Sequence, residues 1–80
     1  MFTVYVLRSQ SSGRLYTGQT DDLTRRFEEH QQGMARYTGA RGPWEIVHTE
    51  DYPTRAEAMA REKYLKSGQG RSWFKEVLER

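Results

Sequence analysis

The fold is set by the stretch from Phe2 to Gln19, which reads FTVYVLRSQSSGRLYTGQ. β-Branched and aromatic residues recur with a period of two over Phe2–Arg8, and this pattern predicts a strand. A polar turn cluster follows at Ser9–Gly13, and strand character resumes over Arg14–Gln19. Residues 2–19 are therefore predicted to form a β-hairpin.

A helix is predicted directly after the hairpin. Either Asp21 or Asp22 can cap it, it extends over Leu23–Gln32, and Gly33 closes it. The helical period places an apolar stripe on one side of this helix, made of Leu23, Phe27 and His30. Met34–Pro43, which is rich in glycine and proline, is expected to be a loop.

The second half of the chain reads as one strand followed by two helices. Trp44–Glu50 has strand character, and Thr54 with Glu57 three residues later forms a capping box for a helix that runs to Ser67 and stops at Gly68. An amphipathic helix is predicted over Arg71–Arg80. The predicted order is ββαβαα, which describes a small α+β domain.

Composition narrows the possible functions. Eighty residues suffice for one domain, here 1–80, with 35% hydrophobic and 30% charged residues. The absence of cysteine excludes disulfides, thiolate zinc sites and a cysteine nucleophile. No phosphate-binding loop and no HExxH motif is present. There is no basic leader and no apolar run long enough for a membrane span, so we expect a cytoplasmic protein.

Gly18 and the two strand tyrosines form the first group of candidate residues. Tyr5 and Tyr16 are on paired strands and could lie close together on one face, although the sequence does not fix the register. Strand tyrosines by themselves are usually packing residues. Gly18 near the end of the second strand indicates a bulge or a close approach of another group to the backbone.

Two residues of the first helix point to an anion site. Arg26 borders the apolar stripe, where a guanidinium needs a carboxylate or a phosphate as partner. Arg25 points to the opposite side, toward water. His30 is on the stripe itself and is either a hydrogen-bonded histidine at the core edge or part of a site.

Glu62 is the third candidate. It shares a helical row with apolar residues, namely Ala58, Met59 and Leu65, while a competing row contains Ala56, Ala60 and Tyr64. A salt bridge to Arg61, Lys63 or Lys66 would explain this carboxylate structurally. The functional alternative is a ligand to Mg²⁺, which commonly takes one or two protein carboxylates and completes its shell with water and substrate phosphate.

The spacing of these residues resembles the GIY-YIG nuclease family. The matching elements are Val4-Tyr5-Val6, Tyr16-Thr17-Gly18, Arg26, His30 and Glu62. The stretches LYTGQT (15–20) and REKYLKSG (61–68) are similar to the small stand-alone bacterial branch, which is related to the structure-specific nucleases of the SLX type.

The resemblance implies a three-stranded antiparallel sheet flanked by helices and a single divalent ion, Mg²⁺ or Mn²⁺. Glu62 would bind the ion, and Arg26 would hold the scissile phosphate. One of Tyr5 and Tyr16 would be the general base, the other would orient the water, and His30 would support them by hydrogen bonding. A tyrosine can act as base only beside positive charge, because its free pKa is about 10.

The sequence departs from the family pattern in two ways. Val4 precedes the first tyrosine where the family has isoleucine, and Thr17 follows the second. Homing-type members carry an asparagine after the metal-binding glutamate, whereas this chain contains no asparagine.

The expected function is metal-dependent DNA cleavage in repair or recombination, selective for structure or targeted by a partner protein. RNA is the alternative substrate. The net charge of +2 permits a polyanionic partner, and the expected phosphate contacts are Arg36, Tyr37, Arg41, Lys66 and Arg71. Two other functions stay open, a nucleic-acid-binding module without cleavage and a purely structural interaction domain.

Overall fold

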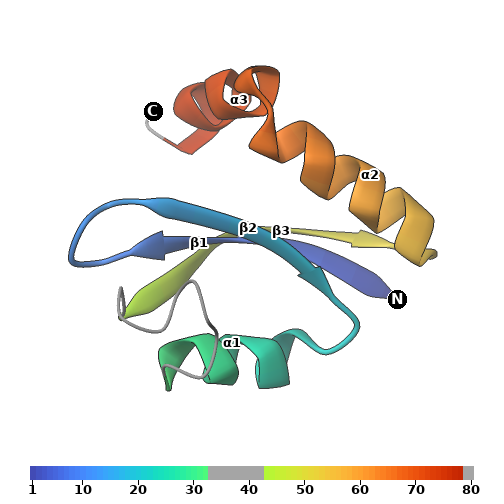
Figure 1. Cartoon of the computed structure of the whole chain (residues 1–80), viewed down its shortest axis with the longest axis horizontal. Helices are drawn as coiled ribbons and strands as arrows, with labels where there is room; N and C mark the ends of the chain where they lie inside the picture. The colour runs from blue at the N-terminus through green and yellow to red at the C-terminus, as the bar shows by residue number, and fades with distance from the viewer. Residues whose placement is uncertain (33–42, 79–80) are drawn as a thin grey trace.

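A three-stranded antiparallel sheet forms the centre of the molecule (Figure 1). The computed structural model describes residues 1–32 and 43–78. Its strands are β1 (Phe2–Ser9), β2 (Leu15–Thr20) and β3 (Trp44–Tyr52), in the order β2-β1-β3. The predicted hairpin, the antiparallel sheet and the order ββαβαα are confirmed.

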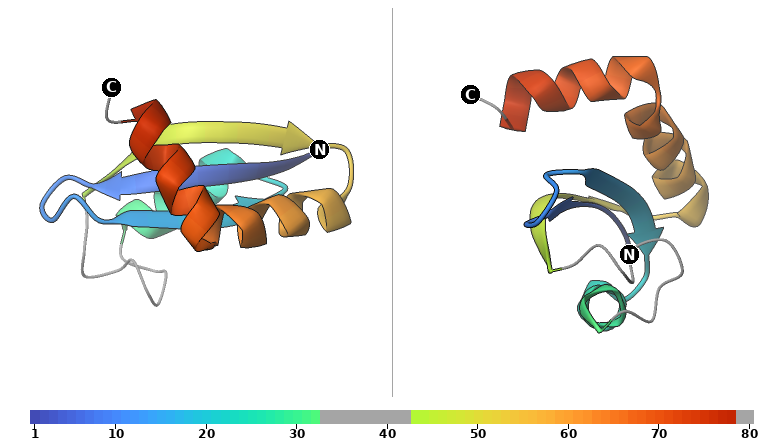
Figure 2. Two further views of the ribbon diagram at one scale, coloured as in Figure 1. Left: turned by 90° about the horizontal axis from the view of Figure 1, so that it is seen from above. Right: turned by 60° about the vertical axis from the view of Figure 1, so that its left-hand side comes forward.

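The central strand β1 supplies two apolar clusters, one on each face of the sheet. Val4 and Val6 face α2 (Arg55–Lys66) and α3 (Gly68–Leu78), whereas Tyr5 and Leu7 face α1 (Leu23–Gln31). This division follows from the pleat, which turns successive side chains to opposite faces. Figure 2 shows the result, with α1 under the sheet, α2 alongside it and α3 crossing the strands.

Helix α1 is fixed at both ends by hydrogen bonds. Asp22 is its N-cap and accepts a bond from the backbone N–H of Arg25 at 3.1 Å. At the other end the Gln31 side chain donates to the carbonyl of Trp44 at 2.9 Å and accepts from its N–H at 2.7 Å. These bonds hold the helix against the start of β3.

Helix α3 begins three residues earlier than the sequence predicts. Thr54 caps α2 as expected, accepting from the N–H of Glu57 at 3.3 Å. Ser67 ends α2 but also accepts from the N–H of Gly70 through its side chain, at 3.3 Å, and from the N–H of Arg71 through its carbonyl, at 3.0 Å. The second helix can therefore start at Gly68, and the prediction of Arg71 as its first residue is wrong.

The remaining boundaries differ little from the prediction. Strand β3 continues two residues past Glu50, to Tyr52, and α1 ends at Gln31. The predicted cap at Gly33, most of the loop Met34–Pro43 and the last two residues lie outside the described ranges. Within those ranges no helix is long and apolar enough to cross a membrane.

Candidate active site

Tyr5 and Tyr16 lie close together on the α1 face of the sheet. The register sets Tyr5 opposite Gly18 and Tyr16 opposite Leu7, so the tyrosines are diagonal neighbours. Their ring centroids are 6.3 Å apart. Tyr5 is only 1% exposed, whereas Tyr16 is half-buried. Of the two rings, Tyr16 is therefore the more accessible to solvent.

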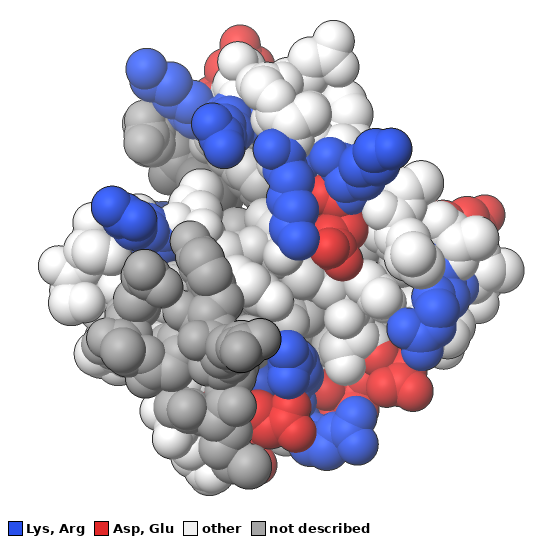
Figure 3. Space-filling model, in the orientation of Figure 1, with Lys and Arg blue, Asp and Glu red and all other residues white. Residues whose placement is uncertain are grey.

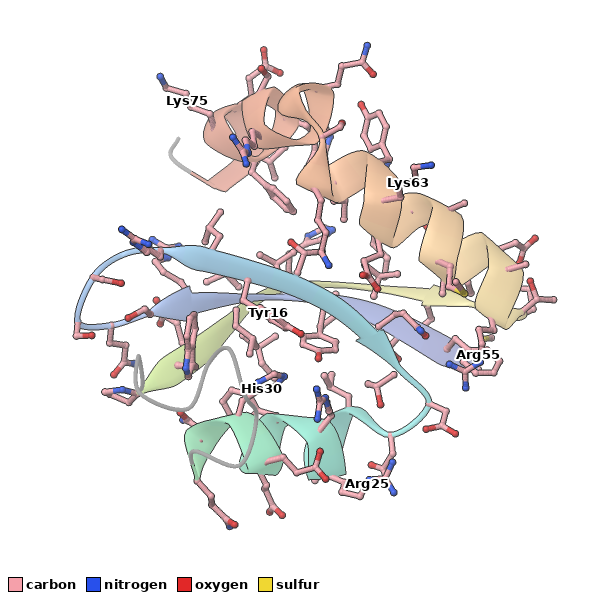
Figure 4. The ribbon with its side chains drawn as sticks, viewed as in Figure 1. Tyr16, Arg25, His30, Arg55, Lys63 and Lys75 are labelled. Atoms are coloured by element: carbon pink, nitrogen blue, oxygen red, sulfur yellow. The ribbon has the colours of Figure 1, made fainter. Side chains whose placement is uncertain are left out.

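His30 completes an aromatic triangle with the tyrosines. Its ring centroid lies 5.8 Å from that of Tyr5 and 5.0 Å from that of Tyr16, in the space between the sheet and α1 (Figure 4). Its Nε2 is 3.0 Å from the Tyr5 hydroxyl oxygen. Burial lowers the pKa of His30, and the charge of Arg26 lowers it further. His30 is therefore a neutral imidazole at pH 7.

Arg26 lies one helical turn before His30 and borders the cluster. Its Nη1 is 2.9 Å from an Oε1 of Glu29, so the anion that the sequence requires beside the stripe is a carboxylate of the same helix. The hydrogen bond to Glu29 raises the pKa of Arg26, as does a further hydrogen bond to Tyr5. Arg25 points away from the cluster, as predicted (Figure 4).

Several neighbouring groups act on the pKa of the Tyr5 hydroxyl. Burial and the neighbouring Tyr16 raise the pKa of Tyr5 to about 12, although the hydrogen bond and charge of Arg26 act in the opposite direction. The charge of Glu62 also raises it. Tyr5 is therefore protonated at neutral pH. The charges of Arg26 on α1 and of Glu62 on α2 therefore both act on the pKa of the Tyr5 hydroxyl.

Gly18 permits the Tyr5 ring to cross the edge strand. A Cβ at this position would lie 2.6 Å from the Tyr5 hydroxyl oxygen, 2.8 Å from its Cζ and 3.2 Å from Cε1 of Tyr16. Any side chain would displace both rings. The close approach that the sequence predicts at Gly18 is confirmed.

We expect Gly18→Ala to lower the free energy of unfolding by about 1–3 kcal/mol, the usual cost of overpacking a closed site. Gly68→Ala is the matched control, because a Cβ at Gly68 meets no atom within 4 Å. Urea denaturation measures both variants. Equal stability of Gly18→Ala and Gly68→Ala would contradict the close packing of Tyr5 on β2.

Glu62 comes from α2, on the other side of the sheet. The helix turns Ala58 and Leu65 into the core, whereas the competing row, Ala56, Ala60 and Tyr64, is exposed. The Glu62 side chain keeps 24% exposure and forms an ion pair with Lys66, whose Nζ lies 2.8 Å from Oε2. Of the possible salt-bridge partners, Lys66 is thus the one used, while Arg61 bonds to Glu50.

The donor set fits a divalent ion held through one carboxylate. Within residues 1–32 and 43–78 no group of three or more histidines and carboxylates converges. An ion at Glu62 would therefore take the rest of its oxygen ligands from water and phosphate, as Mg²⁺ commonly does. Lys66 would have to leave the carboxylate for the ion to bind.

A groove of about 790 Å³ opens between the hairpin and the α2–α3 pair. Two of the predicted phosphate-binding residues, Lys66 and Arg71, line it, together with Arg8 and Lys75. Figure 3 shows a hollow here, with lysine and arginine side chains along its upper rim. The other predicted contacts lie outside the described residues, namely Arg36, Tyr37 and Arg41.

Arg8 is a groove residue that was not predicted from the sequence. The alternation of side chains along β1 puts Arg8 on the same face of the sheet as Val4 and Val6. That face could be assigned to the groove only once the position of α2 and α3 was known.

The fold is that of a nuclease-type catalytic domain. A family model described as the GIY-YIG catalytic domain matches residues 1–76, and the chain therefore belongs to the GIY-YIG family. This is a family of endonuclease domains that generally use divalent metal ions.

Similar proteins carry the family name UPF0213. A UPF0213 protein of Natronomonas pharaonis is 48% identical over 65 residues, covering 80% of this chain and 75% of its own. A UPF0213 protein of Halobacterium salinarum is 45% identical over 67 residues, covering 82% and 86%. The solution NMR structure of a UPF0213 protein from Bacillus halodurans matches with a TM-score of 0.58 at 36% identity, covering 96% of this chain and 85% of that one.

Proposed function

We propose that the protein is a metal-dependent endonuclease that hydrolyses phosphodiester bonds in DNA. The observation that supports this most is the convergence of Tyr5, Tyr16, His30 and Arg26, with a cation beside two hydroxyls and a neutral imidazole. Simple packing does not require an arginine and a neutral histidine at this place. Activity is a property of the site rather than of the family, so these four side chains are the basis of the proposal.

In the proposed reaction Arg26 holds the scissile phosphate. Its guanidinium can donate two parallel hydrogen bonds to phosphate oxygens and balance the charge that develops on them. Glu62 would bind one Mg²⁺ or Mn²⁺ ion, which when bound supplies charge stabilisation and lowers the pKa of coordinated water.

We assign the proton-accepting role to Tyr16 and the orienting role to Tyr5. Tyr5 is buried and protonated, and its hydroxyl is hydrogen-bonded to His30. Tyr16 is the ring that water can reach. The attacking water would pass its proton to the Tyr16 oxygen, and Arg26 together with a bound ion would supply the positive charge that a tyrosine base requires.

The same proposal covers the biological setting. We propose that residues 1–80 act as one domain in the cytoplasm, in repair or recombination of DNA. Cleavage would depend on the shape of the DNA or on a targeting protein, because phosphate contacts alone carry no sequence information.

The test uses the purified protein with branched, nicked and single-stranded DNA, in Mg²⁺, Mn²⁺ or EDTA. We expect cleavage only with metal. In Glu62→Gln the loss of a charged ligand should reduce cleavage at limiting metal by at least about 10- to 100-fold, the scale already seen when only the residues that support a metal ligand are changed. Glu57→Gln, an exposed position on the same helix, is the matched control and should cleave normally.

Two results would contradict the proposal. One is cleavage that persists in EDTA, and the other is equal cleavage by Glu62→Gln and Glu57→Gln. DNA binding without any turnover would instead identify a binding module of the same fold.

A further inference from the structure

The groove between the hairpin and the α2–α3 pair has walls of one charge. Among the lining residues that the structure describes, four are cations, namely Arg8, Lys66, Arg71 and Lys75, and none is acidic. Arg8 comes from β1 and the others from the two helices, so positive charge lines the groove from both sides. A groove with this charge pattern attracts a polyanion and concentrates it locally.

Two of these cations are available for a ligand. Arg71 is exposed and has no acidic partner within the described part of the chain. The buried Nε of Arg8 makes no hydrogen bond there, since its nearest carboxylate, that of Glu45, is 3.6 Å away. An oxyanion between the walls would give Arg71 the partner it lacks and would add to the loose ion pair that Arg8 makes with Glu45.

The lining between the charged walls includes apolar side chains. Leu65 and Phe74 are almost fully buried under the groove, and Leu15 on the hairpin is 42% exposed. Proteins that bind single-stranded nucleic acid combine a cationic groove along the backbone with aromatic side chains against the faces of the bases, and the lining of this groove includes the half-buried Tyr16. A duplex keeps the base faces stacked inside and offers only base edges in its grooves.

The size of the groove also favours a single strand. Its volume of about 790 Å³ is within the range, roughly 300–1,000 Å³, in which proteins enclose small ligands. The whole protein measures 28 × 28 × 18 Å. The major groove of a duplex alone is about 12 Å wide, so a whole double helix is large relative to the shortest dimension of the protein, 18 Å.

We propose that this groove binds an unpaired DNA strand, with phosphates between Arg8 and Arg71 and bases against the apolar lining. The groove leads to the candidate active site at two points. Lys66 lines it and is paired to Glu62, and Tyr16 belongs both to its lining and to the aromatic triangle. Delivery of the strand for cleavage rests on the proposed function, whereas binding of the strand does not.

The test measures binding in EDTA, so that cleavage cannot interfere. Fluorescence anisotropy of a labelled 12-nucleotide oligo-dT is compared with that of a 12-base-pair duplex over a range of salt concentrations. We expect tighter binding of oligo-dT. Arg71→Ala should weaken it and reduce the slope of log affinity against log salt by about 0.7, the value for one phosphate contact on a single strand. Lys63→Ala is the matched control, because Lys63 projects from α2 away from the groove (Figure 4).

Either of two results would overturn the inference: a duplex that binds as tightly as oligo-dT, or equal salt slopes for Arg71→Ala and Lys63→Ala. Groove binding without metal-dependent turnover would leave this inference intact and refute the nuclease proposal. Metal-dependent cleavage by wild type together with unchanged oligo-dT binding by Arg71→Ala would support the nuclease proposal and refute this inference.

Discussion

Replacement of Arg26 by alanine is expected to lower the rate of DNA cleavage about 100- to 1,000-fold, the cost of removing one group that stabilises charge in a transition state. The variant loses the cation that would hold the phosphate. It also loses the hydrogen bond and positive charge that oppose the rise in the pKa of Tyr5. Both effects act on the chemical step, so kcat should fall more than KM rises.

Arg25→Ala is the matched control for this experiment. Arg25 is the next residue on the same helix, its side chain is 64% exposed, and its pairing with Asp21 at 3.8 Å is loose. The two variants remove the same charge from α1 and should have similar melting temperatures. Single-turnover cleavage separates them. Equal rates for Arg26→Ala and Arg25→Ala would show that Arg26 is not part of the active site.

The sequence predicts the elements of this fold well because each has a local signal. The alternation in β1, the cap at Asp22 and the cap at Thr54 depend on neighbouring residues only, and all three are present. The prediction of the first residue of α3 is wrong because it, too, used only a local signal. Gly68 reads locally as a helix end, but the double role of Ser67 as end of one helix and cap of the next depends on the path of the chain.

The sequence predicts which residues form the candidate site better than it predicts how they are arranged. Helical and strand periods select Tyr5, Tyr16, Arg26 and His30, and the structure brings these four together. The sequence could not show that Glu62 is carried by a helix on the opposite face of the sheet from α1, or that Lys66 is already paired with its carboxylate. Those facts depend on the packing of α2 against β1 and β2, which no local pattern encodes.

A second charged cluster, around Glu50, was not recognised in the sequence. His48, Glu50 and Tyr52 alternate along β3, so they share one face of the strand. Glu50 accepts hydrogen bonds from His48 at 2.8 Å, from Tyr52 at 2.6 Å and from Arg61 at 2.7 and 3.1 Å. The available signal was a row of polar residues with a period of two. It lies on a strand that must pack against a helix.

Glu50 fixes the rotation of the helix that carries Glu62. Its carboxylate holds Arg61 of α2, whose guanidinium also lies 5.3 Å from the ring centre of Trp73 on α3. Glu62 is the next residue along α2. A helix held at Arg61 presents Glu62 in a defined direction, so the Glu50 cluster supports the candidate metal ligand from outside the site.

Glu50→Gln is expected to lower the free energy of unfolding by about 3 kcal/mol at pH 7. Burial by itself would raise the pKa of Glu50, but the hydrogen bonds from Arg61, Tyr52 and His48 outweigh it and hold that pKa at about 2. In the unfolded chain a glutamate titrates near pH 4.3, and a difference of about two pKa units corresponds to roughly 3 kcal/mol. The figure applies because the side chain is only 19% exposed.

The lowered pKa of Glu50 determines how the stability difference changes with pH. A carboxyl whose pKa is lowered by folding stabilises the folded state at pH values above its unfolded pKa. That contribution is lost as the pH falls from about 4.3 toward 2. Wild type should therefore lose its advantage over Glu50→Gln across this interval.

Urea denaturation at a series of pH values tests this, with Glu45→Gln as the matched control. Glu45 is on the same strand, but its side chain is 46% exposed and its contact with Arg8 is 3.6 Å, so its loss should change stability by no more than about 0.5 kcal/mol. A Glu50→Gln variant as stable as Glu45→Gln, or a difference from wild type that does not shrink below pH 4, would show that the cluster does not hold α2. If Glu50 holds α2, Glu50→Gln leaves the Glu62 side chain without a defined orientation. The metal concentration needed for cleavage is then expected to rise even where the variant is folded.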